Sequence, residues 1–217
     1  MTKKSLIHWF GIMGIISLVS YTAAVCLAPL AYPNYDWLKQ AVSDLSAIDS
    51  PALLLWNQLN SLYVPFGMAS IMLVIVYIQN KLNKTIRLGI YIFAAMVLIS
   101  GVGYAIFPLT TGGYAGTTLD IMHVYVITPL VVLTSMSSLV LIMIGGFKKR
   151  AYVSLSILAS IALGAMLIGA IGLGAFPNLF GFFERFNVFA AVGFNAVLGI
   201  YLLTGFSDYK NVSSNHK

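Results

Sequence analysis

The stretch that most clearly decides the fold of this chain is residues 117–146, TTLDIMHVYVITPLVVLTSMSSLVLIMIGG. From Ile121 to Gly146 it contains no Asp, Glu, Lys or Arg, and a run of about twenty apolar residues is enough for a helix to cross a bilayer. Asp120 and His123 stand at its start, three positions apart, and such positions share one face of a helix. We therefore expect a transmembrane helix with a carboxylate and an imidazole at its mouth.

The whole chain has the composition of a membrane protein that crosses the bilayer several times. Of its 217 residues, 59% are hydrophobic and 8% are charged, and the mean hydropathy is +0.92. These values lie far outside the soluble globular range. Runs of spanning length predict an all-α bundle of six transmembrane helices, at about 6–30, 53–79, 88–108, 121–146, 152–176 and 186–206.

Three aromatic-proline steps mark one end of the odd-numbered spans. They are Tyr32-Pro33, Phe107-Pro108 and Phe176-Pro177, and proline ends or interrupts a helix. This weak repeat predicts three helical hairpins, although chance among common helix stops would give the same pattern. The expected organisation is a single transmembrane domain over residues 1–217, with hairpins at about 6–79, 88–146 and 152–206 and a short cytoplasmic tail at 207–217.

The charges predict how the chain is oriented. Lysine and arginine gather before the first span, between the second and third spans, between the fourth and fifth spans, and after the sixth span. Most acids lie in the loops at the opposite ends of the spans. The positive-inside rule then places both termini in the cytoplasm, and we expect the chain to lie in the cell (cytoplasmic) membrane. The formal net charge of +6 is thus explained by topology, and no nucleic-acid partner or nucleotide motif is expected.

The first outer loop has a helical pattern of its own. From Asp36 to Ile48 the apolar residues fall on one side at helical spacing, which predicts a short helix lying on the membrane surface. Asp44 lies at the edge of that apolar stripe. It is therefore expected either to face the mouth of the bundle or to be solvated.

Helix-breaking residues indicate that the outer halves of the spans are loosely packed. Pro65 and Pro129 should kink the second and fourth spans, and glycines at Gly101 and Gly169 thin the third and fifth. A cavity open to the outside would explain this pattern, and close helix packing through small residues is the alternative. Asn195, near the middle of the sixth span, is expected to hydrogen-bond a neighbouring helix.

The polar side chains near the outer interface are the candidate site, because ionisable groups at membrane depth are costly. His123 and Asp120 are the candidate catalytic residues for acid–base chemistry, or metal ligands if a carboxylate from another loop joins them. Neither a metal nor a cofactor is identified by the sequence. The expected ligand-binding residues are Asp44, Asn57, Asp120, His123, Glu184 and Arg185.

Glu184 and Arg185 are neighbours in the sequence, so on a helix their side chains diverge by about 100° and only one can point inward. Arg185 suits an anionic head group, because its forked donors match phosphate or carboxylate. The alternative is a structural contact in which Arg185 pairs with Asp120 or Asp44.

Several short motifs together resemble a known family. They are Tyr32-Pro-Asn-Tyr-Asp36, Ser43-Asp44-Leu45, Ser50-Pro51, Trp56-Asn57, Phe107-Pro108, His123 and Glu184-Arg185-Phe186. In these the chain resembles the domain of unknown function 998 (DUF998) family of prokaryotic integral membrane proteins, over most of its length. The resemblance implies six spans and an outward polar cluster, and it implies no activity.

Three functions remain open at this point. The leading hypothesis is an integral membrane protein that binds a lipid head group or small amphipathic ligand in an outward-facing polar pocket, with membrane lipids as partners. The second is a membrane-embedded hydrolase of lipid amide or ester bonds, possibly metal-dependent, with His123 at its centre. The third is an accessory subunit of a membrane complex.

Overall fold

The computed structural model describes residues 5–112 and 114–206 and is all-helical over that part of the chain. In these residues six helices are long and apolar enough to cross a membrane, which confirms the predicted all-α fold with six spans. The expected cytoplasmic tail at 207–217 lies outside the described residues. The candidate spans are Leu6–Ala31, Leu53–Ile78, Lys84–Ile106, Thr118–Phe147, Arg150–Ala175 and Pro177–Thr204.

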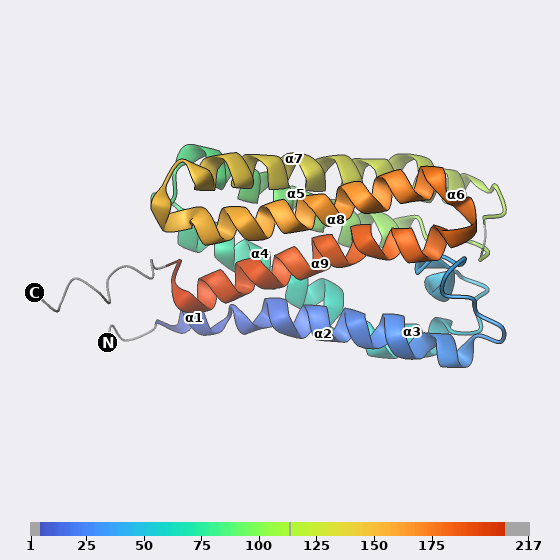
Figure 1. Ribbon diagram of the computed structural model, residues 1–217. Helices are drawn as coiled ribbons and strands as arrows, with labels where there is room; N and C mark the ends of the chain where they lie inside the picture. The colour runs from blue at the N-terminus through green and yellow to red at the C-terminus, as the bar shows by residue number, and fades with distance from the viewer. Residues whose placement is uncertain (1–4, 113, 207–217) are drawn as a thin grey trace, which may run out of the picture.

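The spans contain nine α-helical segments in the described residues (Figure 1). Short 3-10 helices follow or precede several of them, and a π-helix at Met122–Ile127 joins α6 to α7. The α-helices are α1 (Leu6–Trp9), α2 (Ile12–Leu27), α3 (Leu53–Leu59), α4 (Tyr63–Ile78), α5 (Lys84–Ile106), α6 (Thr118–Ile121), α7 (Thr128–Phe147), α8 (Val153–Ala175) and α9 (Phe180–Thr204).

The second and fourth spans are interrupted next to their prolines. The helix breaks between Leu59 and Tyr63, and Pro65 stands in the first turn of α4. Pro129 is the second residue of α7, directly after the π-helix. Proline has no backbone N–H to donate, so it favours a helix start or an irregular turn at both places.

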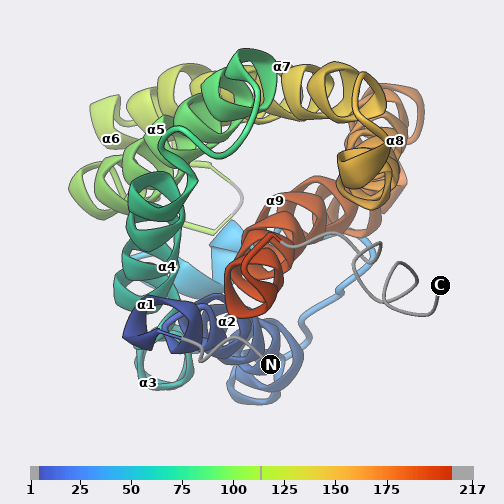
Figure 2. The ribbon, with the colours of Figure 1, turned by 90° about the vertical axis from the view of Figure 1, so that its left-hand side faces the viewer.

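Seen along their axes, the spans form a closed ring (Figure 2). Each of α2, α4, α5, α7 and α8 packs against the next in chain order, and α9 packs against α8, α2 and α4. We call the end that contains Leu6 and Thr204 the terminal end. The end that contains the loops 32–52, 107–117 and 176–179 is the loop end, and residues 32–52 are the first loop.

The terminal-end half of the ring is filled by a continuous hydrophobic core. The helices α2 and α9 meet backbone to backbone there, because a Cβ atom on Gly11 or Gly199 would collide with the main chain of the other helix. Close packing of this kind stabilises helix pairs in membranes. Fully buried members of this core include Ile71, Ile78, Ile90, Leu139, Ile142 and Leu198.

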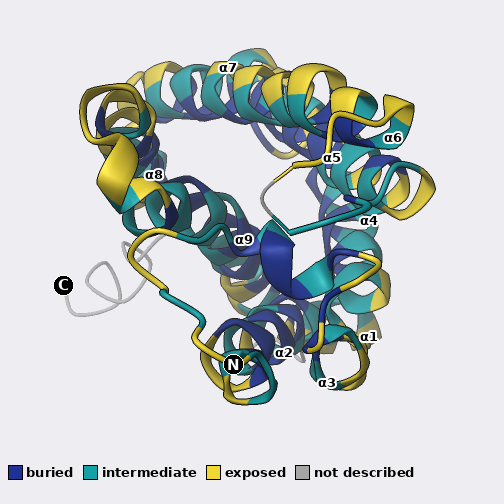
Figure 3. Ribbon diagram, turned by 90° about the vertical axis from the view of Figure 1, so that its right-hand side faces the viewer, coloured by how far each residue is buried: buried dark blue, intermediate teal, exposed yellow. Residues whose placement is uncertain are grey.

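The predicted surface helix over residues 36–48 is wrong. The structure has turns there, followed by a short 3-10 helix at Ser43–Ser46. Side chains take backbone donors that a helix would use: Asp44 Oδ2 accepts from the Ala41 N–H (3.1 Å), and Glu184 Oε2 accepts from the Val42 N–H (2.6 Å). Such bonds compete with helix formation. The segment instead crosses the loop end of the ring (Figure 3).

The sixth span begins earlier than the sequence predicted. The helix α9 starts at Phe180, so Glu184 and Arg185 lie within its second turn and not before it. Both side chains are bonded to the first loop, as described below, and these bonds allow charged groups to be part of the span.

Candidate functional site

A cavity of about 930 Å³ lies in the loop-end half of the ring. Its wall comes from α2, α3, α4, α5, the π-helix, α7, α8 and α9, and the first loop contributes residues from Lys39 to Ile48. It reaches from Pro108 and Tyr114, in the loop between α5 and α6, to Met96 and Asn195 in the middle of the spans. Four of the six predicted ligand-binding residues line it: Asp44, Asn57, His123 and Glu184.

Glu184 and Asp44 bring two carboxyl groups to the cavity below the first loop. Oε2 of Glu184 accepts a hydrogen bond from the Val42 N–H (2.6 Å), and Oδ2 of Asp44 accepts one from the Ala41 N–H (3.1 Å). Asp44 is buried, with 5% of its surface exposed, so it faces the bundle and is not solvated. The Glu184 bond holds the loop against α9, the Asp44 bond closes a turn within the loop, and both residues line the same cavity.

His123 lies on the π-helix and is almost fully buried. Its Nδ1 is 2.7 Å from the carbonyl oxygen of Phe107, and a carbonyl only accepts, so Nδ1 carries a proton. The ring packs on Tyr104, with centroids 4.6 Å apart. In the neutral ring Nε2 is then an acceptor, and it makes no hydrogen bond to the described residues.

Asp120 is a helix cap and does not line the cavity. It accepts hydrogen bonds from the Thr110 N–H (2.7 Å) and the Thr117 N–H (3.0 Å), and from the Thr110 hydroxyl. Thr117 in turn accepts from the Asp120 N–H, which completes a capping box. Within the described residues no hydrogen bond joins Asp120 to His123, so the two expected partners are committed to different neighbours.

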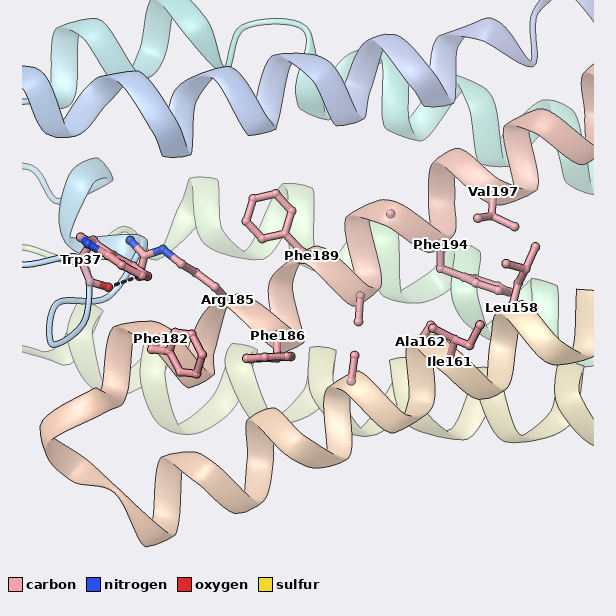
Figure 4. Close-up of a pocket in the computed structure, with 13 residues that line it drawn as sticks. Trp37, Leu158, Ile161, Ala162, Phe182, Arg185, Phe186, Phe189, Phe194 and Val197 are labelled. Atoms are coloured by element: carbon pink, nitrogen blue, oxygen red, sulfur yellow. Dashed lines mark hydrogen bonds between the residues drawn. The ribbon is translucent and has the colours of Figure 1, made fainter.

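Arg185 lies on a different face of α9 from Glu184, as adjacent helical positions require, and it reaches towards Trp37 of the first loop (Figure 4). Its Nη1 donates to the carbonyl oxygens of Trp37 (2.8 Å) and Gly181 (2.6 Å), and its Nη2 donates to the Tyr35 hydroxyl (2.9 Å). Together with Trp37 and aromatic residues such as Phe186, it lines a separate groove of about 520 Å³ between α8 and α9. The guanidinium therefore fastens the first loop to α9 through carbonyls, and neither Asp44 nor Asp120 is its partner.

Tyr35 completes this contact. Its hydroxyl donates to the Ala41 carbonyl (2.7 Å) while it accepts from Arg185. Burial raises the pKa of Tyr35 to about 12, against the opposing effect of the Arg185 charge. The phenol therefore remains neutral near pH 7 and keeps its donor.

Sequence reasoning missed most of the polar groups deeper in the cavity. Four wall residues have a buried side-chain oxygen that finds no hydrogen-bond partner among the described residues: Asn60 Oδ1, Ser135 Oγ, Asn187 Oδ1 and Asn195 Oδ1. The amide nitrogen of Asn195 donates to the Gly67 carbonyl on α4 (3.2 Å), which confirms the predicted hydrogen bond to a neighbouring helix. The amide oxygen of Asn195 is the atom without a partner. The only sign of these groups in the sequence was the presence of isolated asparagines within apolar runs.

A metal site is not assigned. In residues 5–112 and 114–206, no three side chains of His, Cys, Asp or Glu are close enough together to hold one ion. The acids of the candidate site have other contacts: Glu184 and Asp44 bind backbone amides of the first loop, and Asp120 caps a helix.

Comparison with known proteins identifies the family. No curated protein and no solved structure matches the chain. The model of a family described as "Protein of unknown function (DUF998)" matches residues 15–201, a segment that contains all the predicted site residues. Since the match covers most of the chain and agrees with the motifs noted in the sequence, this multi-pass membrane protein belongs to the DUF998 family.

Proposed function

We propose that this protein binds a lipid or another small amphipathic molecule in the loop-end cavity. The observation that carries the proposal is the distribution of polar groups in that cavity. Carboxyls and an imidazole lie near its mouth, apolar side chains form most of its wall, and several buried polar atoms have no hydrogen-bond partner in the part of the chain that the structure describes. Buried polar groups are normally hydrogen-bonded, so these atoms indicate a bound molecule with polar groups of its own.

The size of the cavity agrees with such a ligand. Sites for small molecules usually measure about 300–1,000 Å³, with apolar walls and a few well-placed polar groups. At about 930 Å³, this cavity is at the upper end of that range. It can hold a head group together with part of an alkyl chain.

The proposal includes an orientation. The positive-inside rule puts the terminal end in the cytoplasm and the loop end outside a prokaryotic cytoplasmic membrane. The ligand then enters from the outer leaflet or from the outer aqueous side. Membrane lipids are its expected source.

The test is the identity and amount of the molecules that remain bound after purification in a mild detergent. We expect about one amphipathic molecule per chain by mass spectrometry in the wild type. Ala191 lines the cavity and Gly193, two residues along α9, lines the separate groove. The Ala191→Phe variant should lose the bound molecule because the ring fills part of the cavity.

The Gly193→Phe variant is the matched control and should retain the molecule, since a side chain at Gly193 meets open space. Equal content in both variants, or no bound molecule in the wild type, would refute the proposal. Release of cleaved lipid that stops in His123→Ala would favour the hydrolase alternative. A protein that leaves detergent in a stable complex with a second chain would favour the accessory-subunit alternative.

A further inference from the structure

The cavity wall is rich in groups that accept hydrogen bonds. Glu184 uses one carboxyl oxygen to bind the Val42 N–H, and no donor among the described residues reaches Oε1. Asn187 is one helical turn further along α9, and its Oδ1 is buried without a partner. Asn60 and Asn195 add two more amide oxygens in the same state. A molecule that fits this wall has to bring donors.

Aromatic rings surround the same part of the cavity. Tyr21, Trp56, Tyr63 and Tyr104 all line it. The ring of Tyr21 lies 4.7 Å from that of Tyr63 and 5.9 Å from that of Trp56, between centroids. Clustered aromatic faces attract cations, and an ammonium group among such rings is held by cation–π contacts.

The two neighbouring cations, Arg185 and Lys39, are bound to groups outside the cavity. Arg185 lines the separate groove and donates to the carbonyls of Trp37 in the first loop and of Gly181 in α9. Lys39 lies at the rim, its side chain is 67% exposed, and its ammonium pairs with Asp36 at 3.4 Å. An anionic head group would therefore meet two carboxyls and, among the described residues, no cation aimed at it.

We propose that the ligand is an amphiphile with a primary ammonium head, which lies against Glu184 and Asp44 under the first loop, with its alkyl chain directed towards Met96. An ammonium offers three donors and no acceptor, which complements carboxyl and amide oxygens. This inference rests on the proposed function and narrows its ligand class. It replaces the anionic head group that the sequence suggested for Arg185.

The test uses alkyl amine, alkyl alcohol and alkyl phosphate probes of equal chain length, each brominated at the chain end, with the full-length protein in lipid nanodiscs. Bromine quenches tryptophan only at short range. The chain has three tryptophans. The double variant Trp9→Phe/Trp37→Phe leaves Trp56 in the cavity wall, and Trp9→Phe/Trp56→Phe leaves Trp37 beside the groove as the control.

We expect the brominated amine to quench Trp56 at a concentration about tenfold lower than the brominated alcohol or phosphate needs. A tenfold difference in affinity is what one charge-assisted hydrogen bond supplies. Glu184→Gln and Asp44→Asn should each weaken the amine by about tenfold and change the alcohol by less than about threefold. The alcohol thus reports whether a variant has kept its cavity. If a variant does not fold, the ranking of the three probes in the wild-type protein still tests whether the ligand has an ammonium head.

Two results would overturn the inference and are distinguishable. If the phosphate binds at Trp56 as well as the amine does, or if both carboxyl variants bind the amine normally, the ligand class is wrong and the cavity remains a binding site. If no probe quenches Trp56 more strongly than it quenches Trp37, the proposed function fails as well.

Discussion

The two halves of the ring are built from similar residues and packed in different ways. At the terminal end, large aliphatic side chains such as Ile142 and Leu198 are fully buried, and α2 touches α9 at Gly11 and Gly199. At the loop end, the same helices separate around a cavity whose wall contains polar atoms without protein partners. Because lipid tails are as apolar as leucine, helix association in a bilayer depends on packing. The terminal-end half is therefore expected to carry most of the stability.

The largest expected effect comes from truncating leucines in the two halves. Leu198→Ala removes a fully buried side chain from the packed core and should lower the free energy of unfolding by about 2–5 kcal/mol. Leu173→Ala, in the cavity wall, should cost about 1 kcal/mol or less, since its side chain already borders space. Denaturant titration in mixed micelles measures both. Equal losses would show that the two halves are packed alike.

A smaller effect is expected where the first loop is fastened to α9. Arg185→Gln removes the hydrogen bonds to Trp37, Gly181 and Tyr35. A hydrogen bond to a charged group contributes about 1.5–3 kcal/mol, so the loss of these bonds should accelerate amide exchange in residues 36–48 by about tenfold or more. Hydrogen–deuterium exchange with mass spectrometry measures this rate. Lys39→Gln is the matched control, because its exposed pair with Asp36 contributes little. Unchanged exchange in Arg185→Gln would mean that the loop is held by other contacts.

The smallest effect separates two serines on α7. Both are fully buried, but Ser138 donates to the Gly89 carbonyl (2.8 Å) whereas Ser135 borders the cavity without a partner among the described residues. Ser138→Ala should cost about 0.5–1.5 kcal/mol. Ser135→Ala should be neutral or stabilise by a few tenths, about 0.5 kcal/mol at most, because it removes an unsatisfied group. The same unfolding titration compares them, and a larger loss for Ser135 would contradict the division.

The spans were predictable because their signal is local. A run such as residues 121–146 has to cross the bilayer as a helix whatever it packs against, since every backbone group must be satisfied internally. The position of Glu184 relative to Arg185 was predictable for the same reason, from helical geometry alone.

The first loop was not predictable from periodicity. Its apolar spacing favoured a helix, but its conformation is set by contacts that join distant parts of the chain: Glu184 accepts from Val42, Arg185 donates to Trp37, and the Phe182 N–H donates to the Leu38 carbonyl. The cavity was also out of reach. Asn60, Ser135 and Asn187 belong to different spans, and only their packing brings these side chains to one space.

The contact between Gly11 and Gly199 has a mechanical consequence. Since the nearest atom to a Cβ on either glycine would be the main-chain oxygen of the other, a small tilt of α9 about that point would keep the two backbones in contact. At about 1.5 Å per residue, the start of α9 at Phe180 is about 28 Å from Gly199. A tilt of about 5° would then move Phe180, and the first loop bonded near it, by about 2.5 Å. Such a movement would change the width of the entrance to the loop-end cavity while the aliphatic core stays in contact.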